Sequence, residues 1–191
     1  TYPGAACDIP SRLYSYSFAP NPDWSHTYSG SAEILGYIDS MVEKFELGRF
    51  LRFDHTVVDV TWRESRSLWE ISVKDREPVL ARTVVMASGP LANVSLPKIR
   101  GVETFAGAKI HSARWDHDYD FAGKKVAVVG TGASGVQIVP ELVKVAESVK
   151  VFQRTPGWVL PRTNFRTRGL TREIYRRVPV RGCGKIGRAH V

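Results

Sequence analysis

The chain has 191 residues, 43% of them hydrophobic, and this length accommodates one ordinary domain or parts of two. No apolar run reaches the ~20 residues of a membrane span, and no basic and apolar leader opens the chain. The two cysteines, Cys7 and Cys183, are too few and too far apart for a disulfide framework or a zinc site. We therefore expect a cytoplasmic protein without a metal ion or a membrane partner.

The net charge of +8 comes from one end of the chain. Residues 1–161 carry 18 basic and 18 acidic side chains, whereas residues 162–191 carry 9 basic side chains and 1 acidic one. A nucleic-acid-binding protein presents its positive charge on a folded face. An excess confined to one terminal stretch, without an aromatic platform, is typical of a solvated helix or tail, so nucleic acid is not an expected partner.

A loop and then a helix are predicted for the start of the chain. Residues 1–30 are rich in Pro, Gly, Ser and Tyr and show no periodicity, so we expect an ordered loop. Over residues 31–45, apolar side chains recur at helical spacing and predict an amphipathic helix of about four turns. Ser29 or Ser31 is the expected N-cap, because a serine hydroxyl can accept a hydrogen bond from an N–H group of the first turn.

A small meander of strands is predicted next. Residues 50–62 and 68–75 alternate in polarity and are rich in β-branched and aromatic residues, which is typical of short strands. Turns are expected near 64–67 and 76–78. The apolar run at 81–91 predicts a buried strand that enters a turn of small residues.

A strand–helix–strand unit follows a long loop. Residues 92–123 predict mostly loop. We then expect a strand at 125–129, a helix over about 134–147 and a second strand at 149–152, after which a helical pattern extends to Arg177.

A glycine-rich turn joins the first strand of this unit to its helix. Gly130, Gly132 and Gly135 form the pattern G-x-G-x-x-G in the context that a dinucleotide-binding turn requires. The first glycine permits the tight turn, the second lets the backbone approach a pyrophosphate, and the third lets the helix pack closely on the strand. The N–H groups and partial positive charge of the helix N-terminus favour phosphate. A structural turn in an unrelated α/β domain is the alternative.

The end of the second strand indicates which cofactor is bound. NAD-selective domains place an acidic residue there to bind the ribose 2′-hydroxyl, but this chain reads VFQRTP. Arg154 can instead pair with a 2′-phosphate through its planar guanidinium, and Thr155 can add a hydroxyl donor. The sequence therefore favours NADP(H), with a solvent-facing arginine before a proline turn as the alternative.

Two further stretches resemble a known enzyme family. The sequence FAGAKIHSARWD has the pattern F-x-G-x-x-x-H-x-x-x-W-D, formed by Phe105, Gly107, His111, Trp115 and Asp116. It resembles the signature of Baeyer–Villiger monooxygenases, and YPGAACD at 2–8 resembles the family's segment beside the flavin. The resemblance runs from residue 2 to about residue 177. It implies an α/β, Rossmann-like flavoprotein with two dinucleotide-binding domains, which uses FAD, NADP and O2 to convert a small-molecule ketone into an ester or lactone.

The resemblance also implies roles for individual residues. Asp8 matches an acidic residue that lies near the flavin and the nicotinamide in the family. This acidic residue helps to position the family's catalytic arginine, so Asp8 is the predicted catalytic-site residue. The residues expected to bind FAD are Asp8, Ile9, Tyr14, Val57 and Gly89, and those expected to bind NADP are Gly130, Thr131, Gly132, Ala133, Ser134, Gly135, Gln137, Arg154 and Thr155. His111 and Trp115 are interpreted as coupling domain motion to cofactor state, although a loop histidine can also be a structural hydrogen-bonding residue. Ala6 stands where family members often carry arginine.

The position of the glycine-rich turn predicts that the chain is an internal fragment. In the family, an FAD domain is interrupted by an inserted NADP domain, so a first fingerprint is expected before Thr1 and the catalytic arginine after residue 191. The expected division is part of the FAD-binding domain (1–92), a linker with the signature (93–123), the start of the NADP-binding domain (124–181) and a non-native tail (182–191). That tail ends in IGRAHV, which a common sequencing adapter encodes. The fragment alone is expected to be inactive.

Two other functions remain open on the sequence alone. One is an N- or S-oxygenating flavin-containing monooxygenase, which shares part of the signature but typically lacks the tryptophan followed by Pro or Asp. The other is a non-catalytic NADP-binding module. The flavin-side stretches CDIP and ASG disfavour that second function, because a nucleotide sensor would not need them.

Overall fold

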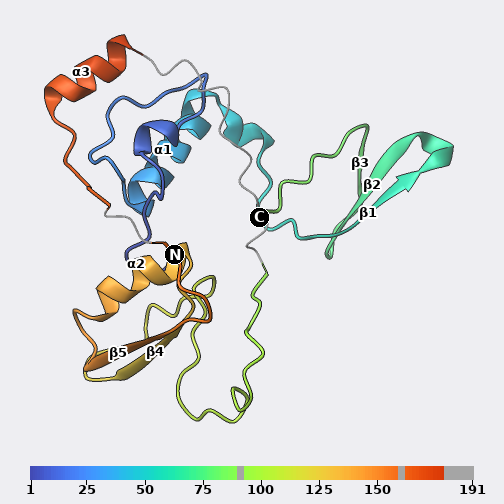
Figure 1. Cartoon of the computed structure of the whole chain (residues 1–191). Coiled ribbons are helices and arrows are strands. Elements are labelled where there is room, and N and C mark those ends of the chain that lie inside the picture. The colour runs from blue at the N-terminus through green and yellow to red at the C-terminus, as the bar shows by residue number, and fades with distance from the viewer. Residues whose placement is uncertain (90–92, 159–161, 179–191) are drawn as a thin grey trace. The chain divides into compact units, whose positions relative to one another are not determined.

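The computed structural model describes residues 1–89, 93–158 and 162–178 (Figure 1). The chain divides into two compact units, Thr1–Met41 with Val94–Val191, and Val42–Asn93. The predicted tail at 182–191 and Cys183 lie outside the described residues.

The first unit opens with a loop and one long helix, as predicted. Residues 1–30 contain a short 3-10 helix, Ser11–Leu13, and no extended strand, and α1 follows at Ser31–Lys44. The N–H of Ile34 donates to the carbonyl of Gly30, at 3.2 Å, which makes Gly30 the N-cap. The predicted serine cap is therefore wrong, because the Ser29 hydroxyl donates to the His26 carbonyl and Ser31 already lies in the helix.

The core of this unit is built around an aromatic pair. Trp24 is 1% exposed, and its ring centroid lies 5.5 Å from that of Tyr37, on the inner face of α1. The Tyr37 hydroxyl donates to the Ala19 carbonyl at 2.8 Å and accepts from the Tyr16 N–H at 2.8 Å. Burying the ring therefore leaves no unpaired hydroxyl, which is the condition for a tyrosine in a core.

The second unit is the predicted meander. Strands β1 (Val57–Arg63), β2 (Leu68–Val73) and β3 (Val79–Ala81) pair antiparallel in the order β1-β2-β3. Trp62 and Trp69 face each other across the first pair, with ring centroids 5.4 Å apart. The first strand begins later than predicted, because a 3-10 helix at Leu47–Phe50 precedes it and 51–56 form no strand.

The predicted buried strand at 81–91 is wrong. β3 ends at Ala81, residues 82–89 form no strand, and 90–92 lie outside the described residues. The side chains of Val85 and Met86 are 83% and 70% exposed. A run of this composition is buried only when neighbouring strands pair with it and cover both its faces, and no described segment does so.

The predicted strand–helix–strand unit is confirmed. β4 (Lys125–Val129) and β5 (Ser148–Phe152) pair in parallel and in register, and α2 (Ala133–Leu142) connects them. The inner face of α2 buries Ile138 and Leu142. The helix ends earlier than predicted, because the N–H of Glu147 donates to the Lys124 carbonyl at 3.0 Å and the chain turns into β5.

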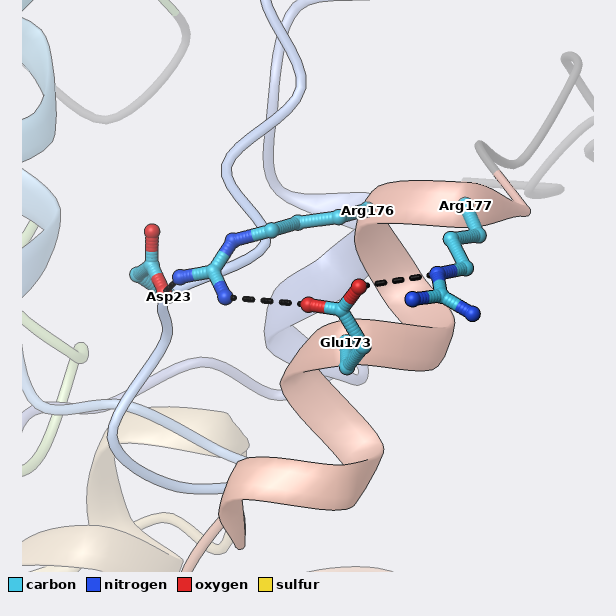
Figure 2. A network of polar contacts seen from close by, with 4 residues as sticks. All are labelled: Asp23, Glu173, Arg176 and Arg177. Carbon is cyan, nitrogen blue, oxygen red and sulfur yellow. Dashed lines mark hydrogen bonds and ion pairs between the residues drawn. The ribbon is translucent and has the colours of Figure 1, made fainter.

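The remaining described residues of the first unit are a long loop and a terminal helix. Residues 93–124 form no helix or strand, as predicted. Helix α3 spans Gly169–Arg177, and Figure 2 shows Arg176 between Asp23 of the N-terminal loop and Glu173 of its own helix. Arg177 also pairs with Glu173, so Arg176 and Arg177 belong to one exposed ionic network (Figure 2).

Candidate functional site

The glycine-rich turn has the geometry that the sequence predicts. Gly130 has φ of +104°, which an L side chain rarely adopts. A Cβ on Gly135 would lie 2.6 Å from the Gly130 carbonyl oxygen, so this position needs a glycine for α2 to approach β4. A Cβ on Gly132 would meet no atom within 4 Å, so its missing side chain leaves open space beside the turn. That space is available to a ligand.

The start of α2 presents unpaired backbone donors to the same space. The N–H of Val136 makes the first intrahelical bond, to the Gly132 carbonyl, and no side chain caps the helix. Among the described residues, the N–H groups of Ala133, Ser134 and Gly135 have no hydrogen-bond acceptor. Free donors at the positive end of a helix dipole favour a phosphate group, and its binding at this turn stays a prediction.

The end of β5 lies beside this turn. The N–H of Gly130 donates to the Phe152 carbonyl at 2.8 Å, which continues the parallel ladder by one bond. Arg154 and Thr155 follow directly and are exposed. The structure thus brings the turn and Arg154 to the same, carboxyl edge of the two strands, where open α/β sheets bind nucleotides.

The predicted flavin-side residues of the first unit lie on a fixed backbone. Asp8, Ile9 and Tyr14 all have exposed side chains. On either side of Asp8, the N–H of Cys7 donates to the Ser29 carbonyl at 2.9 Å and that of Ser11 donates to the Thr27 carbonyl at 2.7 Å. The loop therefore holds its backbone through internal hydrogen bonds and leaves the Asp8 carboxylate exposed.

Cys7 is the buried residue of this loop, with 2% of its surface exposed, and its thiol is free. Burial raises the pKa of the Cys7 thiol, and the nearby Asp8 carboxylate acts in the same direction against hydrogen bonds from Ser11 and Ser29. The protonated thiol is therefore a small core side chain and not a nucleophile.

Gln137 connects this loop to α2. Its Oε1 accepts from the Tyr2 hydroxyl at 2.9 Å and from the Ala6 N–H at 3.5 Å, while its Nε2 donates to the Ala6 carbonyl at 3.0 Å. Figure 1 accordingly shows the N-terminus beside α2. The side chain predicted to bind NADP is thus engaged with the flavin-side segment, and its contact with a cofactor stays a prediction.

A second segment also contacts this loop, and the sequence analysis did not single it out. Arg162 Nη1 donates to the Cys7 carbonyl at 3.3 Å, and its guanidinium lies 5.5 Å from the Tyr28 ring centroid. Asn164 pairs with the Tyr28 peptide in both directions, at 3.0 and 3.2 Å. No local pattern could have indicated these contacts, because they join residues more than a hundred positions apart.

The remaining predicted FAD contacts, Val57 and Gly89, belong to the second unit. Val57 starts β1 opposite Val73, next to an irregularity in the register before Asp59. Gly89 has φ of +73° and is exposed. Their predicted contact with the adenine and the flavin stays a prediction.

The signature residues form compact turns. A Cβ on Gly107 would lie 2.6 Å from the ring of Phe105, so this glycine lets the ring fold back over the backbone. His111 Nδ1 accepts from the Ala113 N–H at 3.1 Å, and the Trp115 ring stacks on Phe121 at 5.5 Å. Asp116 accepts from the Asp118 N–H at 3.0 Å. These bonds stabilise the loop, and a role in domain motion stays a prediction.

A profile of the flavin-binding monooxygenase-like family matches residues 6–174. The chain belongs to this family. The chain combines helices with parallel and antiparallel strands, as the predicted α/β class requires. The resemblance read from the signature is therefore confirmed at the level of the family and its fold.

Individual relatives are longer than this chain. The Baeyer–Villiger monooxygenase of Streptomyces coelicolor is 47% identical over 179 residues, which are 94% of this chain and 34% of that protein. The Baeyer–Villiger monooxygenase of Pseudomonas aeruginosa is 38% identical over the same shares. The chain thus spans about a third of the length of these family members.

Solved structures also match this chain over about a third of their own length. Cyclohexanone monooxygenase from Rhodococcus sp. Phi1, bound to NADP+, superimposes with a TM-score of 0.82 and 36% identity over 92% of this chain and 34% of that one. A complex of OTEMO with FAD and NADP superimposes with a TM-score of 0.82 and 33% identity over 93% of this chain and 36% of that one. This family member therefore has part of the fold of FAD- and NADP-binding monooxygenases.

Two other kinds of site are not seen in the described residues. In the described part of the chain, no group of three or more His, Cys, Asp or Glu side chains is arranged to hold a metal ion. No described helix combines the length and the apolar composition that crossing a membrane requires.

Proposed function

We propose that the chain is part of an FAD- and NADPH-dependent monooxygenase of the Baeyer–Villiger type. Such an enzyme converts a ketone, O2, NADPH and a proton into an ester or lactone, NADP+ and water. One observation carries the proposal. A glycine-rich turn with three free N–H groups occurs in a chain that is 47% identical to a Baeyer–Villiger monooxygenase.

NADP(H) fits the residues of the βαβ unit. The N–H groups of Ala133, Ser134 and Gly135 would donate hydrogen bonds to the pyrophosphate, and the open side of Gly132 gives it room to approach. Arg154 would pair with the 2′-phosphate and Thr155 would add a donor. No acidic side chain follows β5 to favour NAD.

Part of FAD fits the exposed loop of the first unit, whose backbone is held by internal hydrogen bonds. As the family resemblance implies, Asp8, Ile9, Tyr14 and Gly89 would meet the flavin side, and Val57 would meet the adenine. When bound, the flavin supplies the redox chemistry that activates oxygen. The residues of this chain would hold the Asp8 carboxylate near the nicotinamide and the flavin, where it would orient a catalytic arginine. They would also bind the NADP phosphates.

A cytoplasmic location and a small-molecule ketone as the partner belong to the same proposal. A free, buried thiol at Cys7 supports a reducing compartment. The concentration of positive charge after residue 161 supports a solvated end of the chain and no nucleic-acid partner.

The test uses the full-length protein that contains residues 1–181. It should purify with bound yellow flavin, oxidise NADPH in the presence of ketones and release the ester or lactone. Turnover of amines or sulfides without ketones would instead identify an N- or S-oxygenating enzyme. NADPH binding without flavin or turnover would identify a non-catalytic nucleotide-binding module.

A second measurement concerns the chain alone. Residues 1–181, mixed with FAD and NADPH, should form no ester from a panel of ketones, because a single glycine-rich turn serves only one of two dinucleotides. Stoichiometric flavin binding with turnover would contradict this part of the proposal.

A further inference from the structure

Two side chains of the 94–191 segment hold successive peptides of the loop that leads to Asp8. Gln137 bonds both the N–H and the carbonyl of Ala6, at 3.5 and 3.0 Å. Arg162 donates to the carbonyl of Cys7 at 3.3 Å. The next residue along the chain is Asp8. Its backbone position is therefore determined partly by residues that follow it by more than a hundred positions.

The contact at Gln137 is built into the backbone as well as into the side chains. Gly4 has φ of +77°, and a Cβ there would lie 2.6 Å from the Gln137 carbonyl oxygen and 2.9 Å from Glu141 Cγ. Only a glycine lets the N-terminal segment lie this close to α2. The Tyr2 hydroxyl adds a third bond to the Gln137 amide, at 2.9 Å.

Gln137 stands one helical turn beyond the free N–H groups of α2. Ala133 and Gln137 are four residues apart and so lie on the same side of the helix, one above the other. A phosphate bound at Ala133, Ser134 and Gly135 would fix the first turn of α2 and, with it, the position from which the Gln137 amide reaches Ala6.

We propose that Gln137, assisted by Arg162, is a positioning residue through which a nucleotide bound at α2 orders the Ala6–Asp8 stretch. This rests on the proposed function, because it takes α2 as the NADP site and Asp8 as a residue of the flavin side. In the complete enzyme, occupancy of the NADP site would then stabilise the placement of the Asp8 carboxylate.

Amide hydrogen exchange of the full-length holoprotein tests the proposal, with and without NADP+. In the wild type, NADP+ should slow exchange at Ala6, Cys7 and Asp8 by roughly three- to tenfold, as expected when hydrogen bonds of this kind are stabilised. Gln137→Leu should abolish this effect when wild type and variant are compared at NADP+ concentrations that saturate each of them, so that a change in affinity does not enter the comparison.

Two further variants separate positioning from general destabilisation. Arg162→Met should reduce the slowing of exchange that NADP+ causes at the same three amides. If Gln137→Leu does not fold, the proposal is tested with Arg162→Met. Val143→Ala removes an exposed side chain just after α2 and should retain the effect in full. Exchange within α1 should be the same in all variants.

The outcomes are distinguishable from those that test the proposed function. The inference alone would be overturned if NADP+ binds to the wild type but leaves exchange at Ala6–Asp8 unchanged. It would also be overturned if NADP+ slows this exchange in Gln137→Leu and Arg162→Met as much as in the wild type. No NADP+ binding by the full-length wild type would overturn the proposed function and the inference with it.

Discussion

Glu33, in the first turn of α1, accepts two hydrogen bonds from one residue, Ser25: from its N–H at 2.7 Å and from its hydroxyl at 2.6 Å. Burial acts to raise the pKa of Glu33, but hydrogen bonds from Ser25 and the charge of nearby His26 outweigh it. The pKa of Glu33 therefore lies below its ordinary value of 4.5. This pair fixes the chain before α1 to the start of the helix.

The lowered pKa of Glu33 predicts a pH dependence of stability. A carboxyl group whose pKa is lower in the folded state contributes stability above its unfolded pKa, and that stability is lost as the pH falls through the folded pKa. Glu33→Gln should lower the free energy of unfolding by about 1 kcal/mol at neutral pH, and this difference should shrink below about pH 4.5. Denaturant unfolding at several pH values measures it. If the difference in unfolding free energy between the wild type and Glu33→Gln stays constant down to about pH 3, the pKa of Glu33 is not the cause of the stabilisation.

Tyr37→Phe tests the aromatic core. The change removes a hydroxyl that bonds the Tyr16 N–H and the Ala19 carbonyl, both at 2.8 Å, and leaves these groups without that partner. We expect a loss of about 1–3 kcal/mol in the free energy of unfolding, because an unsatisfied buried group loses its hydration without replacement. Ser40→Ala, farther along the same helix, is the control and should cost less. Equal losses in the two variants would show that the Tyr37 hydroxyl is not structural.

Gly135→Ala and Gly132→Ala should separate stability from nucleotide binding. A Cβ at 135 would lie 2.6 Å from the Gly130 carbonyl oxygen, so this variant should lose about 1–3 kcal/mol of stability. A Cβ at 132 meets no protein atom within 4 Å, so the fold should be retained while the affinity for NADP+ falls by at least about tenfold. Thermal unfolding and NADP+ titration of the full-length protein measure both. If Gly132→Ala binds NADP+ as tightly as the wild type, no phosphate approaches this turn.

Arg154→Ala should reduce the preference for NADPH over NADH. A charge-assisted contact with the 2′-phosphate is worth about 1.5–3 kcal/mol, which corresponds to roughly ten- to a hundredfold in selectivity. The rate of flavin reduction by each nucleotide in the full-length enzyme gives the ratio. Lys150→Ala, an exposed cation on β5, is the matched control and should leave the ratio unchanged. If Arg154→Ala keeps the full preference for NADPH over NADH, Arg154 does not bind the 2′-phosphate.

The ionic network on α3 should contribute little to stability. Arg176 bridges Asp23 and Glu173, but the side chains of Arg176 and Asp23 are 50% and 51% exposed (Figure 2). Exposed ion pairs are screened by water and salt, so Arg176→Ala should change the free energy of unfolding by less than about 1 kcal/mol. A larger loss that disappears in high salt would show that the network anchors α3.

The sequence was informative where structure depends on local patterns. The glycine spacing, with a strand pattern before it and a helix pattern after it, predicted the βαβ unit, which the parallel strand pair and its crossover helix confirm. The signature residues identified the family. Helix α1 was also predicted, although its N-cap was placed on the wrong residue, because the Ser29 hydroxyl bonds within the preceding loop.

Features that depend on distant partners were not predictable. The apolar run at 81–91 has the composition of a buried strand, but burial is a property of its neighbours and not of the run itself. Likewise, a glutamine on a helix gives no sign that its amide will pair with a peptide 131 positions earlier. Gln137 was predicted as a cofactor residue, and only the structure relates it to Ala6.

The bond from the Gly130 N–H to the Phe152 carbonyl has a consequence for cofactor engineering. Because it joins the turn directly to β5, the backbone alone sets the spacing between the pyrophosphate end and the ribose end of the proposed nucleotide. Cofactor preference should therefore change through exchange of the side chains at positions 154 and 155. Insertion of one residue after Phe152 would turn Arg154 to the opposite face of the extended chain, since successive side chains alternate there. Selectivity at this edge is thus adjustable by substitution and intolerant of changes in length.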